Sequence, residues 1–317
     1  MYIQDVFVRL YDIRPTGISL LDKIIGNGSK VVKPIANVIL PSVFKKRKGV
    51  RIQEKNKKAV TDAIVCVTSF PQRIPYLWLV IECMLRQTMC VKKIVLYLSK
   101  VQFPNMLEDI PENLMRYCKN VLDIRFVEGD IRSHKKYWYA VKDFPNTPII
   151  TIDDDLIYAS DTIELLTNYA HQYKRCVSCM YAHRMRWDEQ GQMLPYSQLL
   201  NIGRIDIGIV TDASFFGSGG GTYFPVGSLK DADSDFELIK SACPMADDIW
   251  LNAIIRKNGF KTITPRYQNS VPDWTIKENQ SLSHANNGEN MNDIQLNKTI
   301  ELCEKLFGIN PFKKVIL

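Results

Sequence analysis

The amino-acid sequence predicts an α/β fold with a mostly parallel sheet, because short apolar runs alternate with amphipathic helical segments from residue 60 onward. The chain has 317 residues, of which 46% are hydrophobic and 24% charged. This composition is typical of globular proteins and excludes disordered, collagenous and coiled-coil chains. No apolar stretch reaches the ~18–20 residues of a membrane-spanning helix. The first residues are charged and lack a signal-peptide pattern, so we expect a cytoplasmic protein.

Residues 59–160 contain four predicted strands separated by three predicted helices. The strands begin 25 to 30 residues apart, which is about the length of one strand–helix unit. Apolar runs flanked by helices are typical of a parallel sheet that is covered on both faces. The strands are predicted at 63–68, 93–98, 123–127 and 148–152, and the helices at 75–87, 112–118 and 134–143.

The second part of the chain, 161–317, is predicted to be richer in loops. Asp161 and Glu164 have the spacing of a capping box, which predicts a helix from there to Lys174. Another helix is predicted over 247–258 and ends before a glycine.

A single C-x-x-C pair, Cys176 and Cys179, is expected to lie inside a strand. No second pair follows it, so a zinc ribbon is not expected. The other cysteines lie mostly in apolar runs, where a reduced thiol behaves as a small hydrophobic side chain.

Residues 1–58 carry the excess of positive charge. They hold 13 Lys and Arg against 4 Asp and Glu, whereas the rest of the chain holds 28 against 30. A nucleic-acid enzyme would spread basic residues over its main domain, so no nucleic-acid partner is expected. Two interpretations of 1–58 stay open: a solvated surface segment, and an arm on an anionic membrane surface, where each Lys or Arg contributes about 1 kcal/mol. We therefore divide the chain into this basic arm and one domain over 59–317.

Three adjacent carboxylates, Asp153, Asp154 and Asp155, follow the fourth predicted strand. Adjacent carboxylates repel one another unless a cation neutralises them. Strand geometry would place Asp153 and Asp155 on the same face, with Asp154 pointing away. Two hard oxygen ligands suit Mg²⁺ or Mn²⁺ and leave positions for substrate phosphates. The alternative interpretation is a solvated turn with acids that cap a helix.

Further polar residues are expected at the same edge of the sheet, because ligands bind beyond the carboxyl ends of parallel strands. They are Thr68, Ser69 and Arg73 after the first strand, and Asp130, Lys135 and Lys136 after the third. One interpretation is that a lysine pairs with a nucleotide diphosphate. The other is that His134 and the two lysines form a solvated helix start.

A second acidic pair, Asp247 and Asp248, begins the predicted helix at 247–258. One Asp is explained as a helix cap that also favours the helix dipole, but the adjacent second one is not. We predict Asp248 as a general base and Asp247 as a capping or orienting residue. His284 is a candidate third metal ligand, with a surface histidine as the alternative.

The glycine-rich segment 216–221 lacks the P-loop pattern and no helix is predicted directly after it. One interpretation is a flexible or close-approach loop that lines an acceptor site, and the other is a plain turn.

Five motifs in this order resemble those of the bacterial glycosyltransferases of the GT-A fold, family 2-like, that build capsule, O-antigen or other surface polysaccharides. They are TSFPQR at 68–73, RSHKKYWYA at 132–140, PIITIDDDLIY at 148–158, FFGSGGGTYFPVGSL at 215–229 and ADDIW at 246–250. The resemblance covers about 60–310 and leaves the basic arm outside. It implies a GT-A-like (Rossmann-like) fold, with a nucleotide-sugar half over 59–160 and a loop-rich acceptor half over 161–317.

The resemblance also implies roles for the candidate residues. The outer two aspartates of the triplet would bind the divalent metal and the diphosphate, and the later Asp pair would hold the catalytic base. The wider class more commonly has Glu-Asp where this chain has Asp-Asp, so which of the two takes the proton stays open. The expected donor site is Thr68, Ser69, Arg73, Asp130, Lys135, Lys136, Asp153 and Asp154, with Asp153, Asp155 and His284 as metal ligands.

We therefore expect a metal-dependent, inverting glycosyltransferase of the hexosyltransferase type. It would use Mn²⁺ or Mg²⁺ and a nucleotide sugar, with a UDP-sugar as the first choice, and a glycan or lipid-linked acceptor at the inner face of the cytoplasmic membrane. A divalent ion neutralises the leaving diphosphate, and a carboxylate on the opposite side removes the acceptor proton. Two alternatives stay open: a phosphatase of the D-x-D type, and a non-catalytic protein that binds sugar nucleotides or membranes.

Overall fold

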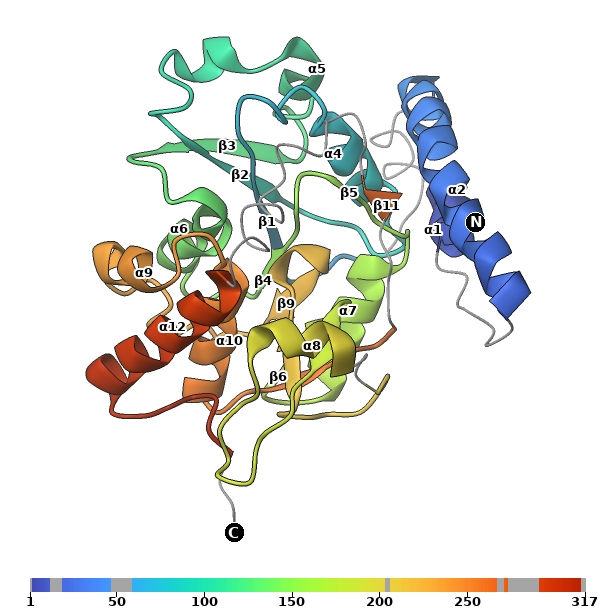
Figure 1. Ribbon diagram of the computed structural model, residues 1–317. Coiled ribbons are helices and arrows are strands. Elements are labelled where there is room, and N and C mark those ends of the chain that lie inside the picture. Colours follow the sequence, from blue (N-terminus) through green and yellow to red (C-terminus); the bar gives the residue numbers. More distant parts are fainter. Residues whose placement is uncertain are drawn as a thin grey trace.

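A central seven-stranded sheet lies between two layers of helices in the computed structural model of the chain (Figure 1). The structure describes residues 2–11, 19–46, 59–202, 206–266, 271–272 and 291–314. Within these residues strands and helices alternate regularly up to residue 143, and the connections become longer after that.

The elements have the following bounds. The helices are α1 Ile3–Tyr11, α2 Ser19–Lys46, α4 Trp78–Leu85, α5 Glu112–Met115, α6 Lys135–Asp143, α7 Thr162–Gln172, α8 Tyr196–Ile202, α9 Phe236–Ala242, α10 Asp247–Lys257 and α12 Met291–Phe307. The short 3-10 helices are η1 Met106–Asp109, η2 Arg132–His134 and η3 Ser218–Gly220. The strands are β1 Ile64–Thr68, β2 Ile94–Ser99, β3 Leu122–Val127, β4 Ile149–Thr151, β5 Leu156–Ile157, β6 Cys176–Cys179, β7 Ala182–Arg184, β8 Ser214–Phe216, β9 Thr222–Phe224, β10 Lys261–Ile263 and β11 Val271–Pro272.

The strand order in the central sheet is β10-β6-β9-β4-β1-β2-β3. Neighbouring strands are parallel except at β9, which pairs antiparallel with both β4 and β6. The register places Val65 of β1 opposite Ile94 of β2 and Ile150 of β4. The prediction of a mostly parallel α/β sheet flanked by helices is therefore confirmed.

Strand β1 shows why both faces of the sheet are covered. Its residues alternate between the two hydrophobic cores: Val65 and Val67 belong to one, and Ile64 and Cys66 to the other. Because successive side chains of a strand point to opposite faces, an apolar residue at every position requires a layer on each side. Helices α1, α2, α4 and α7 contribute to the first core, and α6, α9, α10 and α12 to the second.

The four predicted strands of 59–160 agree with β1 to β4 to within one or two residues. The predicted helices are also present, but α4 and α5 are shorter than expected. Cys176 and Cys179 lie at the two ends of β6 and are buried, as predicted for a strand interior.

The prediction of a capping box at the start of α7 is wrong. Asp161 occupies the N-cap position but its side chain makes no capping hydrogen bond. Its carboxylate accepts two hydrogen bonds from the guanidinium of Arg266, each 2.6 Å long. Glu164 accepts a hydrogen bond from Thr88 instead of reaching back to the cap. The Asp161 carboxylate is therefore bound by the bidentate guanidinium of Arg266, from a distant segment, and not by the backbone N–H groups of α7.

Two helices of the basic arm pack against the sheet domain. The side chains of Phe7 in α1 and of Leu40 and Phe44 in α2 are buried in the first core. Asp5 of α1 accepts hydrogen bonds from the backbone N–H and the hydroxyl of Ser160, at 2.7 and 2.9 Å. The interpretation of 1–58 as a solvated segment is therefore wrong for these helices. The boundary at residue 58 remains a prediction.

Among the described residues, none of the helices is both long enough and apolar enough to cross a bilayer.

Candidate active site

A cavity of about 580 Å³ lies beyond the ends of β1 and β4. Its wall contains every site residue predicted from the sequence that the structure describes. These are Thr68, Ser69, Arg73, Asp130, Lys135, Lys136, Asp153, Asp154, Asp155, Asp247 and Asp248. His284 lies outside the described residues. Segments that are up to 180 residues apart in the sequence thus meet at one edge of the sheet, as parallel topology requires.

The acidic triplet lies in a turn, because β4 ends at Thr151. Strand alternation therefore does not apply, and the expectation that Asp154 points away from the other two is wrong. Asp154 is buried and accepts hydrogen bonds from the Ser69 hydroxyl at 2.6 Å and from Arg73 Nη1 at 2.8 Å. Arg73 Nη1 also lies 2.7 Å from Asp155 Oδ2. One guanidinium thus holds two of the three carboxylates.

Burial raises the pKa of the Asp154 carboxyl above its ordinary value, although the Arg73 charge and the Ser69 hydrogen bond oppose this effect. Asp153 and Asp155 are more open to the cavity, with 42% and 26% of their side chains exposed. The two outer aspartates are therefore more accessible to a ligand than Asp154, which lines the same cavity but is held by Ser69 and Arg73.

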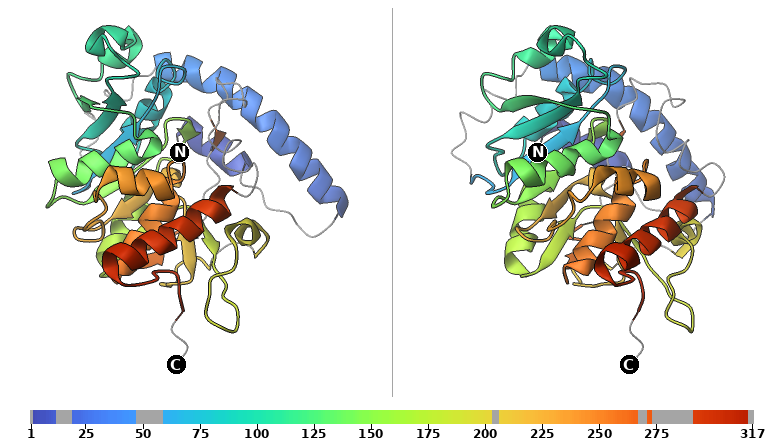
Figure 2. Two further views of the ribbon diagram at one scale, coloured as in Figure 1. Left: turned by 60° about the vertical axis from the view of Figure 1, so that its left-hand side comes forward. Right: turned by 90° about the vertical axis from the view of Figure 1, so that its left-hand side faces the viewer.

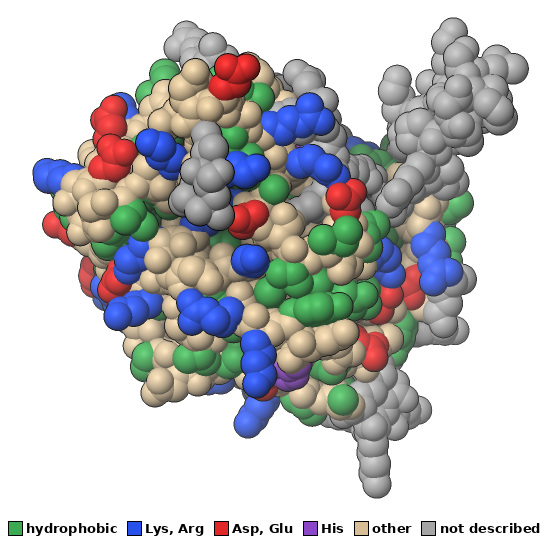
Figure 3. Space-filling model, turned by 90° about the horizontal axis from the view of Figure 1, so that it is seen from below, with side chains coloured by type: hydrophobic (Ala, Val, Ile, Leu, Met, Phe, Trp, Pro, Cys, Tyr) green, Lys and Arg blue, Asp and Glu red, His purple; other side chains and the backbone are tan. Residues whose placement is uncertain are grey.

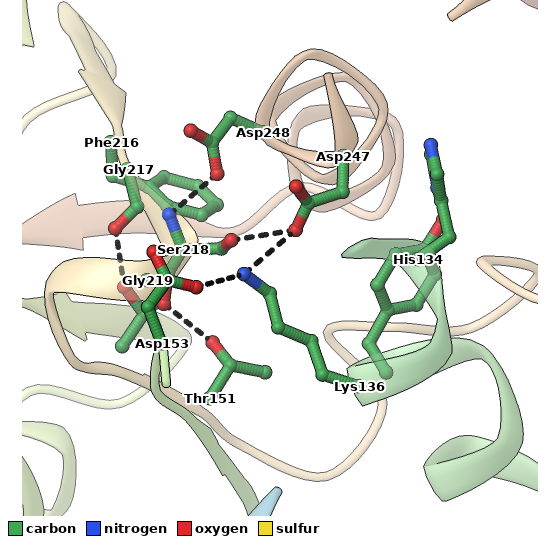
Figure 4. A network of polar contacts seen from close by, with 12 residues as sticks. His134, Lys136, Thr151, Asp153, Phe216, Gly217, Ser218, Gly219, Asp247 and Asp248 are labelled. Atoms are coloured by element: carbon green, nitrogen blue, oxygen red, sulfur yellow. Dashed lines mark hydrogen bonds and ion pairs between the residues drawn. The ribbon is translucent and has the colours of Figure 1, made fainter. Parts of the chain in front are cut away.

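Lys136 connects the triplet with the second acidic pair (Figure 4). Its ammonium Nζ lies 2.8 Å from Asp153 Oδ1 and 3.1 Å from Asp247 Oδ2. Only 2% of its side chain is exposed. Burial alone would lower the pKa of Lys136, but the carboxylates of Asp153 and Asp247 outweigh burial and hold the pKa above its ordinary value. Lys136 is therefore charged and forms an ion pair with each of the two aspartates.

The start of α6 is buried, so the interpretation of residues 134–136 as a solvated helix start is wrong. His134 is fully buried, with Nδ1 2.6 Å from the Tyr137 hydroxyl and Nε2 2.8 Å from the Cys243 carbonyl oxygen. Burial lowers its pKa, so the imidazole is neutral and structural. Lys135 is also buried and forms an ion pair with Asp130.

Ser218, in the glycine-rich segment, holds both aspartates at the start of α10. Its backbone N–H donates to Asp248 Oδ1 and its hydroxyl donates to Asp247 Oδ2, each at 2.7 Å (Figure 4). Neither aspartate caps α10 with its side chain, contrary to the capping role considered for Asp247. Each carboxylate is thereby held in a fixed orientation relative to the cavity.

The two aspartates have opposite pKa shifts. Burial opposes ionisation of Asp247, but the Lys136 charge and smaller contributions that include the Ser218 hydrogen bond together lower the Asp247 pKa. Burial, and after it the negative charge of Asp247, raises the pKa of Asp248 to about 7. Paired acids whose environments separate their pKa values are typical of acid–base sites, because a base functions best with a pKa near the working pH.

The glycine-rich segment is a close-approach loop. A Cβ on Gly219 would lie 1.6 Å from Asp153 Oδ2, so no other residue fits there without moving the aspartate. The Gly219 carbonyl oxygen accepts a hydrogen bond from the Asp153 N–H at 3.2 Å. None of the described residues that line the cavity belongs to 216–221. The loop therefore packs behind the carboxylates, and its expected position on the wall of an acceptor site is not what the structure shows.

Asp153 and Asp155 fit a divalent cation by the chemistry of their donors. Both present carboxylate oxygens to the same cavity, and Mg²⁺ and Mn²⁺ commonly take one or two protein carboxylates together with substrate phosphates. The described residues contain no group of three or more His, Cys, Asp or Glu side chains arranged to hold a metal by themselves. A cation here would therefore depend on ligands from a substrate as well.

Sequence reasoning missed several residues of the cavity. Tyr196 of α8 and Asn292 of α12 lie on its wall, but neither belongs to a motif. Burial, and after it the negative charge of Asp248, raises the pKa of Tyr196. Ser218 was visible only as part of the glycine-rich segment. Its role in orienting two carboxylates depends on long-range contacts, which no local pattern indicates.

Comparisons with known proteins give a fold likeness only. No family model matches the chain, and no curated protein matches it. Among the solved structures that it resembles is a 4-diphosphocytidyl-2C-methyl-D-erythritol synthase, with a TM-score of 0.43 and 11% identity, covering 69% of this chain and 95% of that one. Another is the mannosyltransferase PcManGT from Pyrobaculum calidifontis in complex with GDP-Man and Mn2+, with a TM-score of 0.44 and 12% identity, covering 74% of this chain and 65% of that one. Neither likeness assigns an activity to this chain.

Proposed function

We propose that this protein is a metal-dependent, inverting glycosyltransferase with a GT-A-like fold, which transfers a sugar from a nucleotide-diphosphate sugar to a hydroxyl group of a glycan or lipid-linked acceptor. The observation that carries the proposal is that one cavity contains both the acidic triplet and Asp248, a carboxyl group with a pKa of about 7. Such a transfer needs a site for the metal ion and the charged diphosphate of the donor, and it needs a base of suitable pKa.

The donor would bind at the triplet side of the cavity. Asp153 and Asp155 would hold the divalent ion, which when bound neutralises the negative charge of the diphosphate leaving group. Arg73 keeps Asp154 and Asp155 in place, and Lys135 adds a buried positive charge to the same wall. The Thr68 hydroxyl donates to the Tyr97 carbonyl oxygen at 2.8 Å, so Thr68 shapes the pocket floor through its position.

Asp248 would act as the general base. In its ionised form it accepts the proton of the acceptor hydroxyl, and the hydroxyl oxygen then forms a bond to the anomeric carbon. The bond from that carbon to the diphosphate oxygen breaks, and the nucleoside diphosphate leaves with the electron pair. Attack from the side opposite to the leaving group inverts the configuration. The Ser218 N–H fixes the orientation of Asp248 for this step.

The acceptor would occupy the side of the cavity formed by Tyr196 and Asn292. The Tyr196 ring packs edge-on against Phe215 at 5.2 Å between ring centroids, which fixes its orientation. A fixed aromatic ring with a polar hydroxyl suits a sugar, which has both apolar and hydroxyl faces. We assign a growing surface polysaccharide, such as a capsule or O-antigen precursor, as the acceptor class.

Two substitutions separate the donor site from the base. Asp248→Asn should retain donor binding and lose transfer activity by about 10²- to 10⁴-fold, the usual contribution of a general base. Asp155→Asn should lose Mn²⁺-dependent donor binding as well. Glu108→Gln, at an exposed site on η1, is the matched control and should behave as wild type.

The assay measures sugar transfer with a panel of nucleotide sugars, beginning with UDP-sugars, and donor binding by calorimetry. Full transfer activity in Asp155→Asn would contradict the assignment of the donor site. Release of phosphate from simple phosphoesters without sugar transfer would establish the phosphatase alternative instead. Donor binding with no turnover, unaffected by Asp248→Asn, would establish the non-catalytic one.

A further inference from the structure

Helix α2 has apolar residues on two opposite faces, of which only one is covered. Ala36, Leu40 and Phe44 follow one another at intervals of four and are buried in the first hydrophobic core. The opposite face is exposed, and its large apolar side chains are Val31, Ile35, Val38 and Ile39, with 56%, 44%, 71% and 38% of their surface exposed. These spacings of four, seven and eight residues place the four side chains along a single stripe.

Figure 2 shows that α2 lies on the outside of the molecule, with the end near residue 19 extending beyond the sheet domain. We call Val31, Ile35, Val38 and Ile39 the outer stripe of α2. Isolated exposed apolar residues are common, but a continuous apolar stripe on one helix marks an interaction surface.

The segment of the sequence that contains the outer stripe carries only positive charges. Residues 23–53 contain eight Lys and Arg and no Asp or Glu. Lys45 and Lys46 are exposed and lie in the last turn of α2, after the residues of the outer stripe. On the face of the molecule seen from below, both basic and acidic side chains are present at the surface (Figure 3). The partner of α2 must therefore offer an apolar layer beside negative charge.

We propose that α2 binds the surface of an anionic lipid bilayer, with the outer stripe in the layer between headgroups and acyl chains and the lysines at the lipid phosphates. Helices with one apolar face and flanking basic residues bind membranes in this way, parallel to the surface. Each Lys or Arg near an anionic leaflet adds about 1 kcal/mol. The inner face of α2 remains packed on the protein, so the helix would lie on the bilayer rather than enter it.

A second copy of the chain fits this surface less well. Two copies that met at the outer stripe would bring the exposed Lys45 and Lys46 of each copy toward one another, and like charges repel. A stable protein interface also buries roughly 800 Å² per partner and involves about 20–30 residues on each side. The outer stripe provides four large side chains along one helix.

The test measures binding of the full-length protein to sedimented vesicles and does not depend on enzymatic activity or on the proposed function. We expect binding to phosphatidylcholine vesicles that contain phosphatidylglycerol, and little binding to phosphatidylcholine alone. Val38→Asp should reduce the binding constant at least about tenfold, because a charge replaces an apolar group at the interface. Val101→Asp is the matched control, since Val101 is equally exposed, at 72%, in the loop after β2, and it should bind as wild type.

The double substitution Lys45→Glu and Lys46→Glu provides a second variant, because it leaves the four side chains of the outer stripe unchanged. It should also weaken binding, and high salt should weaken the wild type in the same direction. Thermal unfolding checks that each variant is folded. Wild-type binding by Val38→Asp, or equal binding to vesicles with and without the anionic lipid, would overturn the proposal. So would a wild-type dimer that Val38→Asp converts to a monomer without any vesicle binding.

Discussion

The ammonium of Lys136 lies 2.8 Å from Asp153 Oδ1 at a position where only 2% of the lysine side chain is exposed. The same nitrogen lies 3.1 Å from Asp247, so one buried cation stabilises an aspartate at the end of β4 and another at the start of α10. The two halves of the proposed active site are therefore electrostatically connected through α6.

Lys136→Met should destabilise the protein by about 3–5 kcal/mol, because it leaves the buried carboxylate of Asp247 without its counter-ion and also removes the ion pair with Asp153. Urea denaturation measures the change in the free energy of unfolding. Lys100→Met is the control: Lys100 forms an ion pair with Glu128 at the surface, where removal of a pair costs about 0–1 kcal/mol. Adding Asp247→Asn to Lys136→Met should recover part of the loss. Equal losses for the two lysines would refute the central position of Lys136.

The transfer rate should increase with pH up to about 7 and then become constant. Asp248 can accept a proton only when it is ionised, and its pKa is raised to about 7. Below that value, kcat/KM should fall about tenfold for each pH unit. The measurement is a profile of kcat/KM against pH between about pH 5 and 9.

Asp247→Asn tests the cause of this pH dependence. The charge of Asp247 is the second contribution to the raised pKa of Asp248, after burial. Its removal should lower the Asp248 pKa and move the profile toward acid pH. A wild-type rate that does not change across neutral pH would be incompatible with Asp248 as the base.

Gly219→Ala should abolish activity while the protein remains folded. The added Cβ would lie 1.6 Å from Asp153 Oδ2, so the aspartate must move away from its position beside the cavity. Gly227→Ala is the control, since a Cβ there meets no atom within 4 Å and the positive φ of 86° adds only backbone strain, about 1 kcal/mol. Comparing transfer activity and thermal stability of both variants separates displacement of Asp153 from general strain. Normal activity in Gly219→Ala would show that the position of Asp153 is not important.

The sequence predicted the sheet well for a physical reason. Strands such as β1 are buried on both faces, and this requirement produces continuous apolar runs that are easy to recognise. The residues at the cavity were also predictable, because the carboxyl ends of parallel strands lie along one edge and polar residues follow each strand. Thr68, Lys136 and Asp153 could therefore be expected at one edge of the sheet, whereas Asp248 begins a helix and was assigned to the site as a candidate base and by the resemblance.

Side-chain partners could not be predicted in the same way. Asp161 binds Arg266 and does not cap its helix, and Ser218 orients Asp247 and Asp248. These partners are about 30 to 105 residues apart in the sequence. Such pairs depend on how loops cross one another in space. The rule of strand alternation also failed for Asp154, since the strand ends three residues earlier, at Thr151. Local patterns predict elements, whereas these contacts are determined by tertiary packing.

Binding of a nucleotide sugar to the wild-type protein in the presence and absence of Mn²⁺ tests the central claim most directly. Thermal shift measurements with a panel of nucleoside diphosphates and their sugars should show an increase in the melting temperature that requires the metal. Asp155→Asn should lose this increase, and Glu108→Gln should retain it. If no nucleotide stabilises the wild-type protein with Mn²⁺ or Mg²⁺, the cavity at the acidic triplet is not a donor site and the proposed function is wrong.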